Sequence, residues 1–246
     1  MRSHSLLLDF YKMWPTPVSI KDTETGKYIF ANGRCVDVLG LTSADQMLGL
    51  TVTQLKLAEW SSLPNWAHEV TQMDRLACQR KAPVSGTQIF FNAAGRLVYG
   101  NVSKFIVDPR DDDESPSLVT LFDELDQELS AATLYLLYRK FCGQNQGITS
   151  FLRHLKLDDH FDTPPSEAEL WVLIAQSMGQ TNDVIAEIHD VPLAQVERHA
   201  ETICGRIHSG VGDNIMSALQ SRPTYDMFIS PLSESERMVD LRHSAR

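Results

Sequence analysis

The chain has 246 residues and a formal net charge of −10 at pH 7. Apolar residues make up 43% and charged residues 22%, which is typical of an ordinary folded soluble protein. No apolar run approaches the roughly 20 residues that a membrane-spanning helix needs, and the first residues carry no secretory signal. The negative charge argues against a general affinity for nucleic acid.

The four cysteines are widely scattered, without the spacing of metal ligands. They are Cys35, Cys78, Cys142 and Cys204. We interpret them as buried thiols in a reducing compartment, and therefore expect a cytoplasmic protein with no metal site and no obligatory cofactor.

Strand-like patterns flank a helical segment in the first half of the chain. The predicted strands cover residues 17–21, 27–31, 84–92, 97–107 and 117–125. Gly26 suits a hairpin turn between the first two strands, and Gly95 one between the third and the fourth. This order predicts an α+β domain with one antiparallel sheet.

Helical patterns fill the rest of the chain. The predicted helices cover residues 34–57 with breaks at Gly40 and Gly49, about 65–80, 125–141, near 148–157 and 213–220, and further helices lie in PPSEAELWVLIAQS and on either side of residues 189–192. The helix over 125–141 is rich in leucine and tyrosine. It is suited to pairing two subunits or to packing back on the sheet, and the sequence leaves both open.

The segment PTPVSIKDTETGKYIFAN, followed by VLGL and MLGLT, resembles the opening of a PAS domain. The resemblance covers residues 10–125 and implies a sensory and dimerising module whose five-stranded sheet cups a pocket. Lys104 is the main polar candidate for holding a small ligand there, if strand alternation turns it inward; otherwise it extends to solvent. The aromatic candidates are Tyr28, Phe90 and Tyr99, for which a plain core role is the alternative. His68 lies where haem-binding members carry a ligand, but a lone histidine there is more often structural.

Residues 185–207 read IAEIHDVPLAQVERHAETICGRI, which predicts a short helix, a tight turn at 189–192 and a second helix. The apolar residues Val196, Ala200, Ile203 and Ile207 form one stripe on that second helix. This unit places a recognition helix in the DNA major groove.

With the preceding PPSEAELWVLIAQS, this stretch resembles the LuxR/FixJ-type DNA-binding domain over residues 163–221. Either Ser166 or Thr163 can cap its first helix. Glu197 departs from the family pattern, because it places an anion where a cation attracts phosphate. Residues 161–222 carry a net charge of −6 with neutral histidines, so counterion release offers this domain little affinity.

Helical geometry separates the cations from the acids. Gln195, Arg198, Thr202 and Arg206 share one flank with His199 at its edge, while Glu197 and Glu201 lie on the other. The candidate DNA contacts are Thr181, Asn182, Gln195, Arg198, His199, Thr202 and Arg206. The alternative is a degenerate bundle that contacts proteins.

A PAS domain followed by a LuxR-type helix-turn-helix is the layout of two groups of bacterial regulators. TraJ activators of plasmid conjugative transfer resemble the chain more closely; VqmA quorum-sensing receptors, whose pocket binds a small pyrazine, share the lysine at Lys104. Both imply a homodimer that binds DNA, and nothing supports an enzyme. We expect a PAS domain at 10–125, a helical linker and possible dimer interface at 126–160, a helix-turn-helix at 161–222 and a tail at 223–246.

Overall fold

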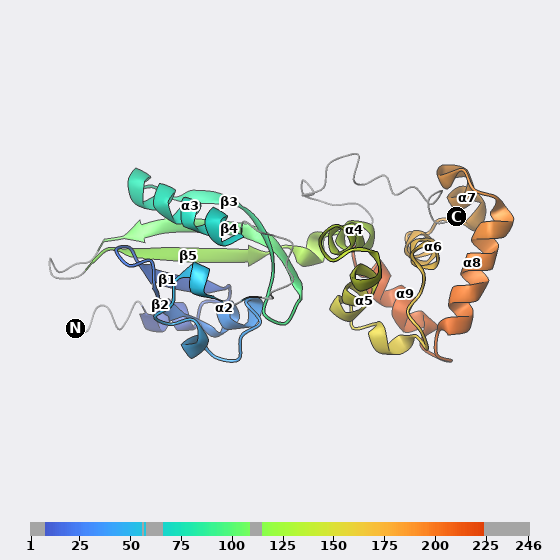
Figure 1. Ribbon diagram of the computed structural model, residues 1–246, viewed down its shortest axis with the longest axis horizontal. Helices are drawn as coiled ribbons and strands as arrows, with labels where there is room; N and C mark the ends of the chain where they lie inside the picture. The colour runs from blue at the N-terminus through green and yellow to red at the C-terminus, as the bar shows by residue number, and fades with distance from the viewer. Residues whose placement is uncertain (1–7, 56, 58–65, 109–114, 224–246) are drawn as a thin grey trace. The chain divides into compact units, whose positions relative to one another are not determined.

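A computed structural model of the chain describes residues 8–55, 57, 66–108 and 115–223. The chain divides into two compact units, Met1–Asp126 and Gln127–Arg246 (Figure 1). The predicted fold class is confirmed, with a five-stranded antiparallel sheet and flanking helices in the first unit and helices alone in the second. Residues 109–114, between the fourth and fifth predicted strands, and all but the first residue of the predicted tail lie outside the described residues. Within these ranges, no helix is long and apolar enough to cross a membrane.

The first unit is built on one sheet with strand order β2-β1-β5-β4-β3. The strands are β1 (Val18–Asp22), β2 (Tyr28–Ala31), β3 (Val84–Phe91), β4 (Leu97–Val107) and β5 (Ser117–Glu124). Gly26 and Gly95 turn the two hairpins with φ of +67° and +75°, which is the left-handed region that glycine tolerates. The paired residues of β4 and β5 run without a shift from Gly100↔Glu124 to Val107↔Ser117, so side chains alternate strictly along β4.

The helical segment between β2 and β3 is shorter than expected. It holds α2 (Gly33–Val38), two single 3₁₀ turns (Ala44–Gln46 and Val52–Gln54) and α3 (Trp66–Arg80). The predicted breaks at Gly40 and Gly49 coincide with positive φ of +67° and +79°, but the described residues from Gly40 to 57 form only the two 3₁₀ turns and not the predicted helical pieces.

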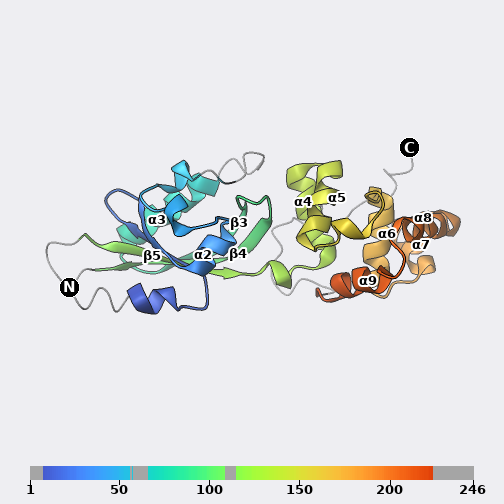
Figure 2. The ribbon, with the colours of Figure 1, turned by 90° about the horizontal axis from the view of Figure 1, so that it is seen from below.

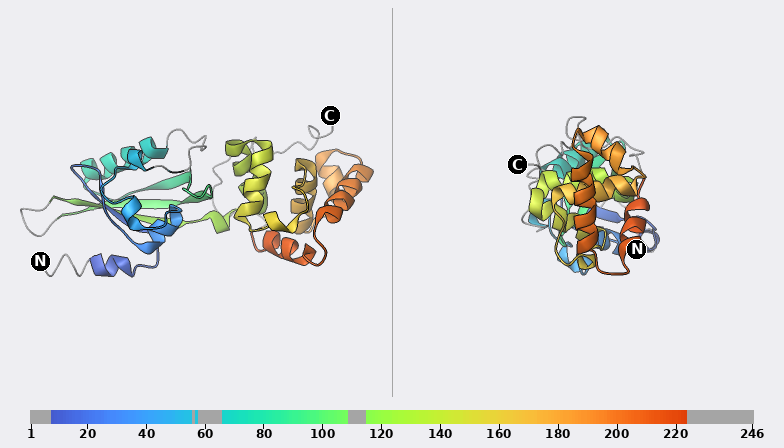
Figure 3. Two further views of the ribbon diagram at one scale, coloured as in Figure 1. Left: turned by 60° about the horizontal axis from the view of Figure 1, so that its bottom comes forward. Right: turned by 90° about the vertical axis from the view of Figure 1, so that its right-hand side faces the viewer.

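The sheet buries a different core on each face. On one face, α2 and α3 cover a core that includes Cys35, Val70, Phe90 and Val102. On the other, a helical turn at residues 8–12 brings Tyr11 onto a second core; it contains Val18, Ile20, Phe30 and Val119. Figures 2 and 3 show that turn and α3 on opposite sides of the sheet.

The second unit consists of helices. They are α4 (Ala131–Cys142), α5 (Gln144–His154), α6 (Glu167–Ser177), α7 (Asn182–His189), α8 (Leu193–Arg206) and α9 (Gly212–Gln220). In Figures 1 and 3, α6 lies between the α4–α5 pair and α8. A capping box starts α6, since the Ser166 amide donates to Glu169 Oε2 at 2.7 Å, which settles the two capping candidates in favour of Ser166.

Helix α4 begins later and packs differently than the sequence suggested. It starts after Ser130, whose hydroxyl accepts from the Thr133 amide at 3.2 Å, and not at residue 125. Its apolar residues, Tyr135 and Tyr138 among them, are buried, and α4 packs along α5. A Cβ on Gly147 would lie 2.9 Å from the Arg139 Cα, so only glycine permits this close approach. Much of the apolar surface attributed to dimerisation is thus buried within its own unit; pairing through this helix stays a prediction.

Candidate functional site

The predicted helix-turn-helix is present in α7 and α8. Helix α7 ends at His189, and Asp190 adopts the left-handed conformation with φ 53° and ψ 47°. Pro192 then occupies the N-cap position of α8, where the fixed φ of proline suits the start of a helix. Ile185 of α7 and Val196 of α8 are buried against α6 in one apolar cluster, which holds the two helices at a fixed angle.

The three cations of residues 161–222 have very different surroundings. Arg198 is exposed and, among the described residues, has no ion-pair partner. Arg206 is turned back toward α6: its guanidinium lies 3.4 Å from Glu169 Oε1 and donates to the Pro164 carbonyl at 3.0 Å. Arg222 is buried and donates to the Leu129 carbonyl at 3.2 Å. The expectation that Arg206 adds a second free cation to the DNA-facing flank is therefore wrong in this arrangement.

The remaining candidate DNA contacts also differ in whether their side chains are exposed or held by neighbouring residues. Thr202 is exposed, and its hydroxyl donates to the Arg198 carbonyl at 2.7 Å; Gln195 is half-buried on the same flank. The Nε2 of His199 is buried with no hydrogen-bond partner among the described residues, and burial lowers the pKa of this half-buried side chain; its contact with DNA stays a prediction. Thr181 occupies the N-cap of α7 without capping it through its side chain, and the Asn182 amide oxygen accepts from Gln176 at 2.9 Å.

Acids dominate the exposed faces of both helices. Asp183 and Glu187 on α7, and Glu197 and Glu201 on α8, are all exposed. The free thiol of Cys204 is exposed as well, so the interpretation of all four cysteines as buried is wrong: α8 turns position 204 toward solvent. Arg198 therefore stands on an otherwise acidic surface.

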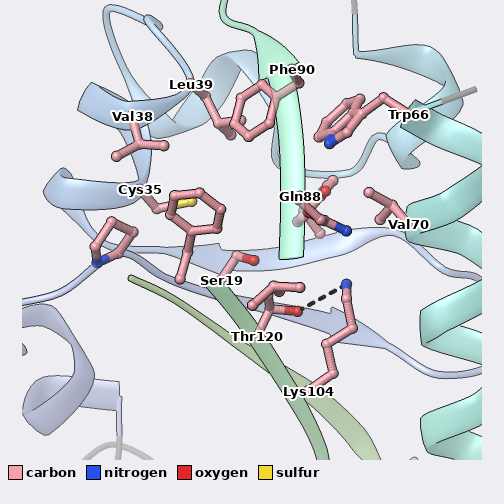
Figure 4. Close-up of a pocket in the computed structure, with 14 residues that line it drawn as sticks. Ser19, Cys35, Val38, Leu39, Trp66, Val70, Gln88, Phe90, Lys104 and Thr120 are labelled. Atoms are coloured by element: carbon pink, nitrogen blue, oxygen red, sulfur yellow. Dashed lines mark hydrogen bonds between the residues drawn. The ribbon is translucent and has the colours of Figure 1, made fainter. Parts of the chain in front are cut away.

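The face of the sheet under α3 encloses a small cavity of about 50 Å³. Figure 4 shows Lys104 and Thr120 entering it from the sheet, with Gln88 and Phe90 on β3 and Val70 on α3 around them. Of the candidate ligand residues, Tyr28, Phe90 and Lys104 line the cavity. Lys104 is only 2% exposed, so the alternative in which it extends to solvent is wrong.

Tyr99 and His68 do not belong to the cavity. Tyr99 is five residues from Lys104 on the regularly paired strand β4, and an odd separation puts the two side chains on opposite faces of the sheet. His68 is exposed on α3, with its Nε2 2.7 Å from the Gln72 side chain. No group of three or more metal-ligating side chains is found in the described ranges.

Two buried lysines beside the cavity share one carboxylate. Lys104 Nζ lies 2.5 Å from Asp74 Oδ1, and Lys21 Nζ lies 2.6 Å from Asp74 Oδ2. Both lysines are 2% exposed, and Asp74 is 17% exposed. Lys21 Nζ also lies 4.6 Å from the centre of the Tyr28 ring. This cluster ties α3 to β1 and β4 and carries a formal charge of +1 with both lysines protonated.

Lys21 and Asp74 were not among the predicted site residues, although the sequence pattern indicates a buried position for each. In β1, Ser19 and Lys21 alternate with Val18 and Ile20 of the opposite core, so Lys21 shares the face of Lys104. In α3, Asp74 follows Val70 by four residues and precedes Ala77 by three, which places it on the buried stripe.

The contribution of Lys21 to the free energy of unfolding should become more favourable as the pH rises. Burial lowers the pKa of Lys21 to about 8 from 10.5; Asp74 opposes this shift, Lys104 adds to it and Cys35 opposes it slightly. Between these two values the unfolded chain still binds a proton that the folded chain has lost, so the folded state gains stability with rising pH. We expect the free energy of unfolding of the wild type, measured with urea, to rise relative to that of Lys21→Met between about pH 7 and about pH 10. Lys27→Met controls for net charge, and a difference that stays flat or falls contradicts the assignment.

Comparisons with known proteins find only distant likenesses. No protein-family model matches the chain, and no curated protein does. Similar solved structures include a complex of VqmA from Vibrio cholera with ligand and DNA, at 16% identity over 93% of this chain and 92% of that chain, with a TM-score of 0.44. Phage VqmA bound to DPO is 17% identical over 92% of this chain and 90% of that chain, with a TM-score of 0.44. The PAS domain of Bordetella pertussis BvgS is 19% identical over 50% of this chain and 87% of that chain, with a TM-score of 0.40. At these identities and scores, no residue's role transfers to this chain.

Proposed function

We propose that the protein is a DNA-binding transcription regulator that acts as a homodimer through its PAS-like domain. The observation that supports this most is Arg198: it projects from the second helix of a helix-turn-helix, beside Thr202 and Gln195, with no internal partner among the described residues. Arginine and glutamine are the side chains that read guanine and adenine edges in the major groove. The sequence resemblance to PAS domains supports the dimer.

The acidic surface explains what kind of DNA binder this is. One outward cation on α8 releases few counterions, so a single domain binds weakly. A dimer places two recognition helices on half-sites about 34 Å apart and adds their contributions. The regulator therefore depends on dimerisation to bind DNA. Its resemblance to TraJ activators supports an activator of a plasmid conjugative-transfer operon that works in the cytoplasm.

Replacing Arg198 by alanine tests the proposal. We expect an affinity loss of about 10- to 100-fold for duplexes selected by the full-length chain from a random pool, because an arginine contact to a base is worth about 1–3 kcal/mol. Fluorescence anisotropy over a salt series measures it, with an unchanged circular dichroism spectrum as a check on folding. Arg34→Ala removes an exposed arginine from the first unit and should leave affinity unchanged. Equal binding by the two variants would refute the DNA-binding role of this helix.

A second candidate function is contact with another protein through the same helices. Val184, Ile188 and Leu193 are 40%, 58% and 38% exposed on α7 and at the start of α8, and apolar side chains that gather on one exposed surface mark sites of protein contact. An activator that binds DNA normally when Arg198 is replaced, but fails when Ile188 is replaced by serine, would favour this function.

A third candidate is a ligand-gated regulator, in which the cavity under α3 takes a small heteroaromatic molecule. The buried Lys104 and the aromatic side chains of Phe90 and Tyr28 support a ligand site there. Saturable thermal stabilisation of the full-length chain by pyrazine, lost in Phe90→Ala, would support it.

A further inference from the structure

The cavity under α3 has one polar wall and one apolar wall. Its polar side chains, Lys104, Thr120, Gln88 and Ser19, come from the sheet, and Val70 on α3 is one of its apolar side chains (Figure 4). Phe122 on β5 is another. A molecule with one polar end and one short apolar end matches these walls.

Within the described residues, the charge on the polar wall is not fully balanced. Asp74 is the one carboxylate paired with Lys21 and Lys104 in the described part of the chain, and it uses both of its oxygens to do so. A buried charge without a counter-ion is unfavourable, so the cluster with both lysines protonated favours one additional anion. Of the two lysines, Lys104 lines the cavity.

The Lys104 ammonium also has hydrogen-bonding capacity left. It carries three N–H donors, and the acceptors that the described residues supply are Asp74 Oδ1 at 2.5 Å and Thr120 Oγ1 at 3.4 Å. One N–H is therefore available to a ligand oxygen, and the Thr120 hydroxyl can donate its own hydrogen to the same ligand.

The volume limits the size of the ligand. A cavity of about 150 Å³ holds benzene, and one water needs about 10–15 Å³. The 50 Å³ of this cavity is about a third of that space, so an aromatic ring fits only if the lining side chains move. It suits a molecule of a few heavy atoms.

We propose that this cavity binds a small monocarboxylate of about two or three carbons, with its carboxylate on Lys104 and its alkyl end against Val70 and Phe122. This deepens the ligand-gated function, since it exchanges the neutral heteroaromatic for an anion at the same site. It does not depend on DNA binding, which the Arg198 variant tests separately.

Propionate and propionamide test the charge requirement, because they share a shape and differ in charge. At fixed pH and ionic strength, with chloride as the balancing anion, we expect propionate to raise the Tm of the full-length chain in a saturable way. Propionamide should bind about 10-fold more weakly or worse, since a charge-assisted hydrogen bond is lost. Equal responses to the two, or no response to propionate, would overturn the proposal.

Lys104→Met tests the location and keeps the length of the side chain. It leaves Lys21 and Asp74 as a balanced pair, and should weaken propionate binding about 10-fold or more, while Lys27→Met leaves binding unchanged. Propionate stabilisation that persists in Lys104→Met would place the effect elsewhere. If Lys104→Met does not fold, NMR on the wild-type protein still tests the charge requirement. The methyl resonance of propionate should then broaden more than that of propionamide. A Tm shift by pyrazine without one by propionate would refute the anion and retain the ligand-gated function.

Discussion

Replacing Asp74 by asparagine should lower the free energy of unfolding of the first unit by about 3–5 kcal/mol, because it leaves two buried lysines without their counter-ion. The substitution keeps the shape of the side chain and removes only its charge. Burial lowers the pKa of Lys21 to about 8, so near and above that pH Lys21 loses its proton and one uncompensated charge disappears. The loss of unfolding free energy is then closer to 3 than to 5 kcal/mol, on the order of the lower value.

Urea denaturation followed by tryptophan fluorescence measures the effect, with Trp66 on α3 itself among the three tryptophans of this unit. Because the chain has two compact units, the transitions are fitted separately. Glu69→Gln makes the same chemical change at an exposed position of the same helix and should cost less than about 0.5 kcal/mol. Similar stabilities of the two variants would mean that the cluster carries little of the unit's stability.

Reversing the charges of Glu197 and Glu201 to lysine should raise nonspecific DNA affinity on the order of 100-fold at about 50 mM salt. A helix of about 10–12 Å diameter fills a major groove about 12 Å wide, so both of its flanks approach phosphates. In the wild type, one of these flanks presents exposed carboxylates. Each new lysine should also steepen the dependence of log affinity on log salt by about 0.9.

Anisotropy titrations of the same duplex at several salt concentrations give both the affinity and the slope. Glu24→Lys with Glu69→Lys changes the net charge equally at exposed positions of the first unit and is the matched control. If the control gains as much affinity and slope as the α8 variant, overall charge and not the position of the acids limits binding.

Most secondary structure could be predicted because it depends on local pattern. Strands β3 and β4 and helices α3, α7 and α8 lie within a few residues of their predicted ranges. The errors occurred where one residue decides the boundary. The residues after Gly40 form 3₁₀ turns in place of the predicted helical pieces, and Ser130 caps α4 five residues after its predicted start at 125.

The candidate sites were only partly predictable. Tyr99 and Lys104 could have been separated from the sequence alone, since alternation on one strand puts them on opposite faces. The choice between an inward and an outward Lys104 could not, because it depends on Asp74, which is 30 residues away along the chain.

By itself, the sequence determined the order of strands and helices, the helix-turn-helix and the acidic character of its surface, since each follows from residue type and short-range spacing. Only the tertiary structure decided which cations are available. Arg198 and Arg206 share a flank of α8 by helical geometry, yet Arg206 reaches Pro164, 42 residues earlier, and Arg198 does not. A guanidinium near a buried carboxylate pairs with it, and such neighbours are brought together by folding and not by spacing along the chain.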